Sequence, residues 1–145
     1  MKETPSAYPF SESIRVQIAA LAERHQLLLV CLYGSQAQQK TRPESDLDIA
    51  ILGKRRILSK AFAKLSMELA EIFQRNDVDV KSLHRVSPLF RYQAMKNSIL
   101  LYGTSLDYER YKLYAFRDYQ DSRSLLKLRD QIIERRLAHA GNRTH

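Results

Sequence analysis

The sequence predicts an α/β fold, in which a small mixed sheet is flanked by helices and followed by a C-terminal helical extension. Apolar runs of strand length alternate with segments whose apolar residues recur at helical spacing. The last third of the chain then keeps helical spacing without a further strand pattern. A chain of 145 residues can bury a core of its own, so we predict a single domain over residues 1–145, with its core at about 11–103 and C-terminal helices at about 105–139.

The first predicted elements are a helix and a buried strand. Apolar residues recur every three or four positions after Ser11, which predicts a helix over residues 11–25 with one buried face. The run Leu27–Tyr33 is short and apolar and is predicted as a buried strand. Cys31 lies in that run, so this lone cysteine is predicted to be buried and to form no internal disulfide.

A second strand, a helix and a third strand follow. Pro43 ends a polar crossover that starts at Ser35, and residues 46–52 are predicted as the second strand. Residues 60–75 have one apolar side and are predicted as a helix. Polar and apolar residues alternate over 77–80, which predicts a half-buried third strand.

Helices dominate the remainder of the chain. A serine followed by a proline at positions 87 and 88 is typical of a helix start and predicts a helix over about 89–97. After a short apolar segment, Ile99–Tyr102, a long helical stretch is predicted over 107–138, with a break near 120–124. We interpret the tyrosines along this stretch as packing against the core or a partner rather than stacking on bases. They are Tyr108, Tyr111, Tyr114 and Tyr119.

Composition limits the class of protein without choosing a function. The net charge is +8, which attracts nucleotides, RNA or an acidic protein surface. The chain has no apolar run of membrane-spanning length, and its N-terminus lacks the apolar segment of a signal peptide. We therefore predict a cytoplasmic protein that does not enter a membrane.

Asp46 and Asp48 are the strongest candidates for chemistry. Alternate side chains of a strand point to the same face, so these two carboxylates should lie together while Leu47 points into the core. Neighbouring carboxylates repel each other unless a cation lies between them. Oxygen ligands of this kind suit Mg²⁺ or Mn²⁺, and Mg²⁺ is normally shared with substrate phosphates.

Two further features complete the candidate site. Gly34 and Ser35 form a turn just upstream, where a glycine lets the backbone approach a phosphate and the serine hydroxyl can donate to it. If the third strand pairs beside the second, Asp79 can supply a third carboxylate. Asp77 should face the same side and is the rival candidate; we favour Asp79 because apolar residues flank it on both sides.

These motifs carry a family resemblance. Gly34-Ser35, ten residues, then Asp46-x-Asp48 resembles the signature of the DNA polymerase beta-like nucleotidyltransferase superfamily. The short length resembles the minimal nucleotidyltransferases, which are MNT-domain antitoxins paired with HEPN-domain ribonuclease toxins. Family members place a third Asp in a strand similar to that around Asp79. They usually have Gly four residues after the motif Ser, where this chain has Gln39.

The resemblance implies an antitoxin of a type VII toxin–antitoxin pair that acts as a protein adenylyltransferase. It would transfer AMP from ATP to a tyrosine hydroxyl of a HEPN ribonuclease toxin and thereby silence the toxin. Asp46 and Asp48 would bind two Mg²⁺ ions, one of them shared with Asp79, while Gly34 and Ser35 would hold the β and γ phosphates. We therefore expect ATP as substrate and a complex with the toxin.

Other functions remain open at this point. The domain could neutralise its toxin by stoichiometric binding alone, although a pure binder has no need to hold unpaired carboxylates together. It could act on a small molecule, although an acceptor pocket is not apparent in the sequence. Nucleic-acid binding would rest only on charge and tyrosines, so we expect no direct nucleic-acid contact. Lys40 and Arg42 in the crossover are weaker candidates for phosphate contacts.

Overall fold

The computed structural model describes residues 8–37 and 46–142. Its sheet has four strands in the order β3-β2-β1-β4. The central pair, β1 (Leu27–Tyr33) and β2 (Leu47–Gly53), is antiparallel, β4 (Ile99–Tyr102) pairs antiparallel with β1, and β3 (Val78–Ser82) pairs parallel with β2. The mixed α/β sheet predicted from the sequence is therefore confirmed, including the bounds of the first strand.

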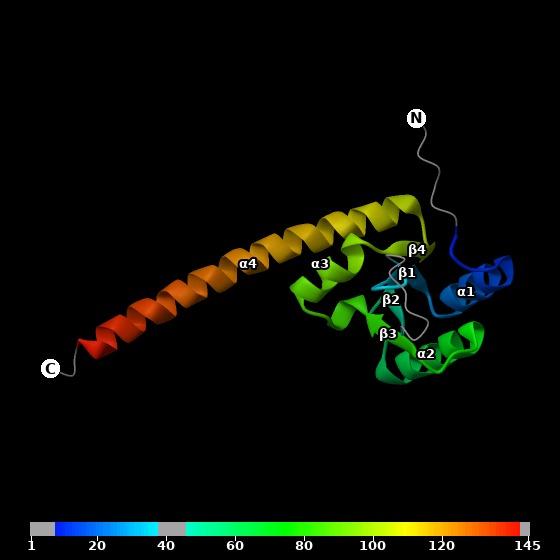
Figure 1. The fold of residues 1–145 in the computed structure, drawn as a ribbon, viewed down its shortest axis with the longest axis horizontal. Coiled ribbons are helices and arrows are strands. Elements are labelled where there is room, and N and C mark those ends of the chain that lie inside the picture. Colours follow the sequence, from blue (N-terminus) through cyan, green and yellow to red (C-terminus); the bar gives the residue numbers. More distant parts are fainter. Residues whose placement is uncertain (1–7, 38–45, 143–145) are drawn as a thin grey trace, which may run out of the picture.

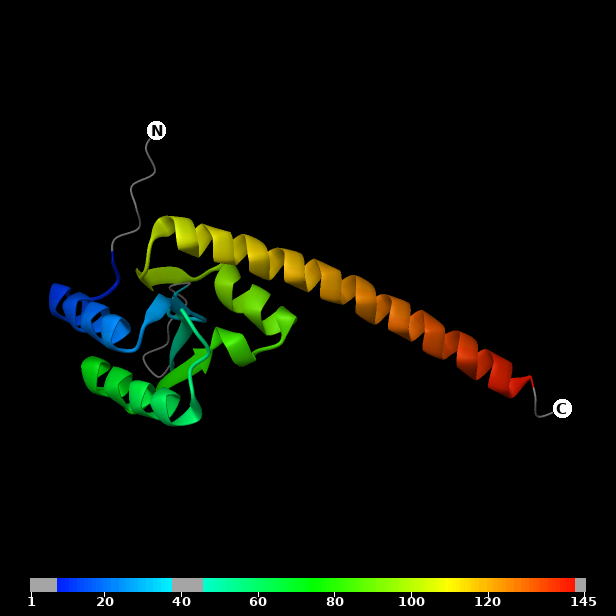
Figure 2. The same ribbon diagram turned by 180° about the vertical axis from the view of Figure 1, so that it is seen from behind.

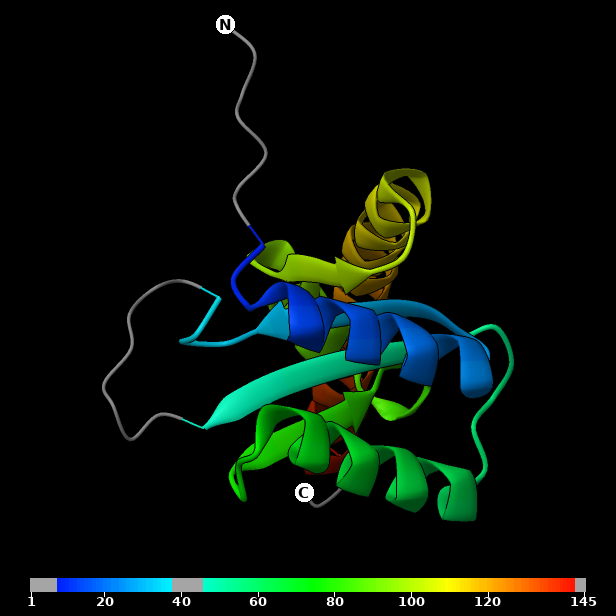
Figure 3. The ribbon, with the colours of Figure 1, turned by 90° about the vertical axis from the view of Figure 1, so that its right-hand side faces the viewer.

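Helices cover both faces of the sheet (Figure 3). The helices α1 (Glu12–Arg24) and α2 (Ser59–Phe73) lie on one face. On the other face lie α3 (Pro88–Lys96) and the first part of α4 (Ser105–Gly141). The structure thus has three layers, and the sheet forms the middle one.

The alternation of side chains along β2 builds both halves of the core. Leu47, Ile49 and Ile51 belong to the cluster under α1 and α2. Ala50 and Leu52 belong to the cluster on the α3 and α4 side. Side chains two residues apart share a face, so Asp48 lies on the α3 and α4 side, at the end of the row that Ala50 and Leu52 begin. The fold therefore places Asp48 beyond the edge of the second apolar cluster.

Short polar residues set the start of three helices. The side chains of Ser11, Ser87 and Thr104 each accept a hydrogen bond from a backbone N–H in the first turn of α1, α3 and α4. Such caps satisfy donors that have no partner within the helix. Pro88 follows Ser87 in the first turn of α3, where its fixed φ favours the helix. The helix starts predicted at residues 11 and 87–88 are confirmed.

The break predicted near residues 120–124 is wrong. Helix α4 continues without interruption over 37 residues from Ser105 to Gly141. No Gly or Pro interrupts the segment, and the Ser124 hydroxyl donates to the Gln120 carbonyl at 3.1 Å, so this serine is accommodated within the helix. Its first half packs on the domain and its second half projects far from it (Figures 1 and 2).

The buried side chain of Arg91 in α3 holds α4 against the domain. Its guanidinium donates to the carbonyl of Leu83 at 2.9 and 3.2 Å and to the Asp118 carboxylate of α4 at 2.9 Å. It also lies over the ring of Tyr114. Leu83 begins η1 (Leu83–Arg85), the short 3₁₀ turn that follows β3. One side chain therefore joins α3, α4 and the end of β3.

Replacement of Arg91 should destabilise the domain. We expect Arg91→Met to lower the free energy of unfolding by about 2–3 kcal/mol, because buried carbonyls and a carboxylate lose a charged donor. Urea denaturation followed by circular dichroism measures this. Arg110→Met, at an exposed position of α4, is the matched control and should change the value by less than about 0.5 kcal/mol. Equal losses for both variants would show that the Arg91 contacts do not stabilise the fold.

The burial predicted for Cys31 is confirmed. Cys31 is fully buried, and burial raises the pKa of its thiol to about 12. In the described part of the chain, no helix has both the length and the apolar character needed to cross a membrane.

Candidate active site

The ends of three strands place Tyr33, Asp48 and Asp79 in one row across the sheet. Tyr33, the last residue of β1, is the register partner of Asp48 in β2. Asp48 is in turn the register partner of Asp79 in β3. Register partners on adjacent strands point to the same face. The pairing therefore brings Asp79 beside Asp48, as expected if the third strand lay next to the second.

Gly34 brings the turn after β1 against Asp48. Its φ of +75° lies in the left-handed region that favours glycine. A Cβ placed on Gly34 would overlap the Asp48 carboxylate, so the absence of a side chain is also needed for the close approach. Ser35 lies in the same turn. The predicted glycine bend and the carboxylates thus share one corner of the domain.

The carboxylate of Asp48 has more negative than positive charge around it. Burial, followed by the charges of Asp79 and Asp46, raises the pKa of Asp48, and Lys81 partly offsets this rise. Asp46 is exposed at the residue before β2. Repulsion of this kind is relieved by a cation bound between the carboxylates. The three predicted aspartates therefore interact electrostatically, and their oxygen donors suit Mg²⁺ or Mn²⁺.

Lys81 is a further candidate residue of this site that the sequence alone does not single out. Its Nζ lies 3.6 Å from Oδ1 of Asp79, and both side chains are about half exposed. Lys81 follows Asp79 by two positions on β3 and so shares its face, and this spacing is the signal that could have found it. Across residues 8–37 and 46–142, no three His, Cys, Asp or Glu side chains are gathered as a ready metal site. Lys81 instead balances part of the negative charge.

Asp77 occupies a different environment from Asp79. Arg75 donates to both carboxylate oxygens of Asp77, at 2.7 and 2.6 Å. This hydrogen bonding lowers the pKa of Asp77. The carboxylate of the rival candidate is thus engaged by a guanidinium, whereas Asp79 lies beside Asp48 in the ladder.

Tyr33 is the second residue of this corner that the sequence does not single out. Its ring is almost fully buried and meets Phe90 of α3 edge to face, with ring centroids 5.8 Å apart. Burial, and then the charges of Asp48 and Asp79, raise the pKa of its hydroxyl. The phenol therefore stays protonated at neutral pH and forms an uncharged wall of the site. Gln39, Lys40 and Arg42 lie outside the described residues.

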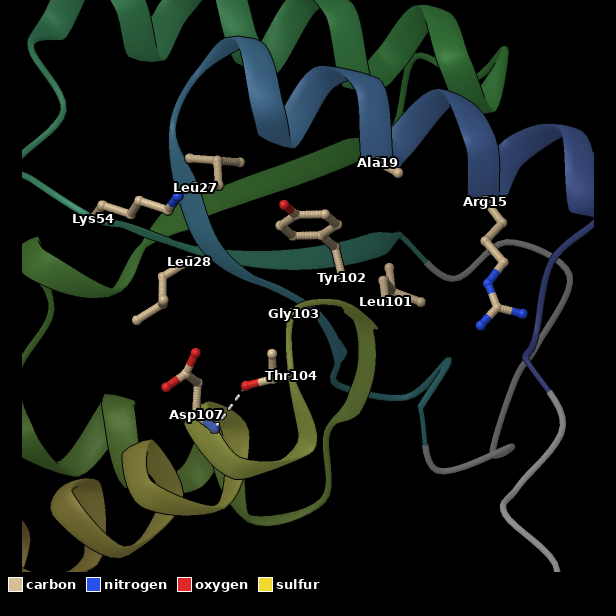
Figure 4. A pocket seen from close by; sticks show the side chains of 10 residues that line it. All are labelled: Arg15, Ala19, Leu27, Leu28, Lys54, Leu101, Tyr102, Gly103, Thr104 and Asp107. Carbon is tan, nitrogen blue, oxygen red and sulfur yellow. Dashed lines mark hydrogen bonds between the residues drawn. The ribbon is translucent and has the colours of Figure 1, made fainter.

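A cavity of about 440 Å³ lies at the opposite end of the sheet (Figure 4). It is lined by the start of β1 at Leu27, by Lys54 just after β2 and by Gly103 just after β4. Arg15 borders it from α1, and Asp107 borders it from the first turn of α4. The lining mixes both signs of charge, and the strands separate it from the aspartates. This cavity is therefore not part of the carboxylate site.

A comparison with protein families decides the membership of the chain. The model of the family described as "Polymerase beta, Nucleotidyltransferase" matches residues 17–107, a segment that holds the glycine bend and all three aspartates. The chain belongs to this nucleotidyltransferase family. The family resemblance seen in the sequence is thereby confirmed, and the domain is a nucleotidyltransferase that acts on a nucleotide substrate.

Individual relatives show which nucleotidyltransferases this chain is similar to. Shewanella oneidensis has a protein named protein adenylyltransferase MntA that is 29% identical over 119 residues, or 82% of this chain and 83% of the relative. A crystal structure of a toxin–antitoxin with AMP-PNP contains a similar chain, with a TM-score of 0.67 and 28% identity over 85% of this chain and 98% of that one. A structure of tri-AMPylated Shewanella oneidensis HEPN toxin in complex with MNT antitoxin also matches, with a TM-score of 0.62 and 26% identity over 86% of this chain and 96% of that one.

Proposed function

We propose that this nucleotidyltransferase is an antitoxin that transfers AMP from ATP to a tyrosine hydroxyl of a HEPN ribonuclease toxin and so neutralises it. The observation that carries the proposal is the placement of Asp79 beside Asp48, next to the Gly34 bend. The relatives support the substrate class, because one is named a protein adenylyltransferase and another is seen in complex with an AMPylated HEPN toxin. Such a protein acts where ATP and the ribonuclease are found, which is the cytoplasm.

Asp46, Asp48 and Asp79 would hold the divalent cation, which we take to be Mg²⁺, and two ions would suit three carboxylates. The donor set fits, because it consists of oxygen ligands alone and because the charges of Asp46 and Asp79 already raise the pKa of Asp48. When bound, Mg²⁺ neutralises phosphate charge and lowers the pKa of an attacking hydroxyl. We propose Asp79 rather than Asp77 as the third ligand, since Arg75 engages both oxygens of Asp77.

The remaining groups of the corner would bind and orient the triphosphate. Gly34 approaches Asp48, and the backbone of this turn and the hydroxyl of Ser35 would supply hydrogen-bond donors to the phosphates. Lys81 lies 3.6 Å from Asp79 and could exchange this partner for a phosphate oxygen once a metal ion occupies the carboxylates. Tyr33 and Phe90 would exclude water from one side. Catalysis would then rest on positioning and charge neutralisation.

The raised pKa of Asp48 predicts how stability depends on pH when no divalent ion is present. The native state keeps this proton at pH values where the unfolded chain has lost it, so ionisation in the native state is unfavourable. The stability that the protonated carboxyl contributes is lost as pH rises from about 4 through the raised pKa. We therefore expect Asp48→Asn to melt at a higher temperature than the wild type at pH 7, with the difference shrinking toward pH 3. Thermal denaturation in EDTA measures this.

Asp77→Asn is the control of opposite sign in the same experiment. Arg75 lowers the pKa of Asp77, so its ionised form is favoured in the native state. Its replacement should lower the melting temperature at pH 7, and this loss should disappear as pH falls through the lowered pKa. If Asp48→Asn lowered the melting temperature in EDTA at pH 7, the burial of the Asp48 carboxylate and its repulsion by Asp79 and Asp46 would not dominate the stability of this site.

The direct test of the function is intact-mass analysis of the acceptor. The protein is incubated with the cognate HEPN ribonuclease, Mg²⁺ and each of the four ribonucleoside triphosphates in turn. We expect the mass of the HEPN protein to increase by whole AMP units with ATP, and the increase to vanish in EDTA. Replacing the modified tyrosine with Phe, once peptide mapping has located it, should remove the increase. An unmodified HEPN protein under all conditions would refute the proposal.

Stoichiometric neutralisation is the second candidate, and the same assay separates it from catalysis. A binding antitoxin would block the ribonuclease at a one-to-one ratio without ATP and without a mass change. A catalytic antitoxin blocks it at a small fraction of the toxin concentration, provided that ATP and Mg²⁺ are present. The intact row of carboxylates beside Gly34 favours catalysis, because ionised Asp48 is costly in the absence of a cation.

A further inference from the structure

The projecting half of α4 carries an apolar stripe that contacts no other part of the described chain. Residues 123–142 are all exposed. Six large apolar side chains in this segment are between 44% and 67% exposed. Leu128 is one of them, and the other five define what we call the α4 stripe: Leu125, Leu126, Ile132, Ile133 and Leu137. Burial of such side chains is favourable because it removes apolar surface from water. A helix this long, projecting into water, is therefore expected to gain stability from a covering partner.

The α4 stripe continues the side of the helix that already packs on the domain. Residues seven apart in a helix lie on nearly the same side. Asp118 pairs with Arg91 of α3, and Tyr119 stacks on Tyr92 at 4.9 Å between ring centroids. Leu125 and Ile132 repeat the position of Asp118, whereas Leu126 and Ile133 repeat that of Tyr119. A partner that covers the stripe would thus extend the packing of α3 along α4.

Charge within the stripe argues against a second copy of this chain as the partner. Ala115 is buried against the domain, and two arginines repeat its position at intervals of seven residues, Arg129 and Arg136. Self-pairing along the stripe would place these arginines against one another among apolar side chains, which is unfavourable. Arg129 has an ion pair with Asp130 at 3.9 Å, but both side chains are about two-thirds exposed, so this contact neutralises little. The stripe therefore requires acidic groups opposite it.

We propose that the α4 stripe docks in an apolar groove of the acceptor protein, and that Asp or Glu side chains of that groove pair with Arg129 and Arg136. The identity of the occupant as the acceptor rests on the proposed function. The surroundings agree with an acidic partner, because residues 122–142 contain five Lys or Arg and two Asp or Glu. Docking at a site remote from the carboxylates would hold the acceptor tyrosine at a high effective concentration near Asp48.

Two double variants with equal charge change test the docking. Arg129→Glu with Arg136→Glu places like charge against the acidic groove. Arg117→Glu with Lys127→Glu makes the same charge change at exposed positions on the opposite side of α4, where the stripe is absent. Calorimetric titration with the cognate HEPN protein, whose own tyrosines are unmodified, should show at least about 30-fold weaker binding for the first variant and less than about threefold for the second. Circular dichroism of both variants checks that α4 remains helical.

The possible outcomes separate docking from the proposed function. Equal weakening by both variants would overturn the docking, because it would show attraction to net charge alone. Unchanged binding by both would overturn it as well, even if wild-type protein transfers AMP. If wild type binds and only the stripe variant weakens, but wild type transfers no AMP, the docking stands and the proposed function fails. Sedimentation should show wild-type protein alone as a monomer, and a dimer dispersed by the stripe variant would identify a second copy as the occupant.

Discussion

Replacement of Asp46 and Asp48 together by Asn should abolish Mg²⁺-dependent AMP transfer. Each change removes a charge but keeps the shape, so the cation loses its anchors while β2 retains its packing. We expect the rate to fall by at least about 10³-fold, since metal binding contributes several kcal/mol to the stabilisation of the transition state. The transfer rate is measured with labelled ATP at saturating acceptor and Mg²⁺. Circular dichroism and thermal denaturation establish that the variant is folded.

Asp79→Asn and Asp77→Asn are a matched pair of variants that tests which aspartate is the third metal ligand. Asp77 lies just before β3 and Asp79 lies within it, yet Asp79 aligns with Asp48 whereas Arg75 engages Asp77. We expect Asp79→Asn to lower the rate by at least about 10²-fold and Asp77→Asn by less than about threefold. The reverse order would identify Asp77 as the third ligand and leave the rest of the site in place. Undiminished transfer by the Asp46 and Asp48 double variant would refute the carboxylate mechanism.

Gly34→Ala should nearly eliminate transfer while the protein still folds. The φ of +75° costs an L-residue about 1–2 kcal/mol, and the new methyl group would push against the Asp48 carboxylate. We expect a loss of about 1–3 kcal/mol in the free energy of unfolding and at least about 10²-fold in rate, because both the bend and the carboxylate must move. Urea denaturation and the labelled-ATP assay, run on one preparation, measure the two effects.

Gly141→Ala is the matched control for the glycine bend. A Cβ at Gly141 would meet no atom within 4 Å, and this residue ends α4 far from the carboxylates. The variant should keep the wild-type rate and stability within the error of the assays. If Gly34→Ala behaved in the same way, a close approach of this turn to Asp48 would not be needed for the reaction.

The sequence was most informative where burial and local chemistry act in the same direction. Along β2, apolar residues at every second position set the strand and its two faces, and hence the side on which Asp48 lies. Ser11 and Ser87 mark helix starts because their side chains satisfy backbone donors in the first turn. Gly34 was recognisable as a turn residue, and the structure adds its positive φ and its approach to Asp48.

The features that the sequence could not predict depend on contacts between segments far apart in the chain. The order of the strands could not be derived from spacing, so the alignment of Asp79 with Asp48 stayed conditional until the pairing of β2 with β3 was known. Arg91 shows no local pattern, since its partners come from η1 and α4. The break expected at 120–124 is absent because no Gly or Pro lies in this stretch, so the backbone hydrogen bonds of α4 continue through it.

A crystal structure with Mn²⁺ and a non-hydrolysable ATP analogue would test the central claim most directly. Anomalous scattering locates Mn²⁺ without reference to the protein density. We predict Mn²⁺ in contact with carboxylate oxygens of Asp46, Asp48 and Asp79, and phosphates of the analogue at the Gly34 turn. Mn²⁺ remote from these aspartates, or a triphosphate bound instead in the cavity beside Lys54, would contradict the claim that the carboxylates and the glycine bend form one nucleotidyl-transfer site.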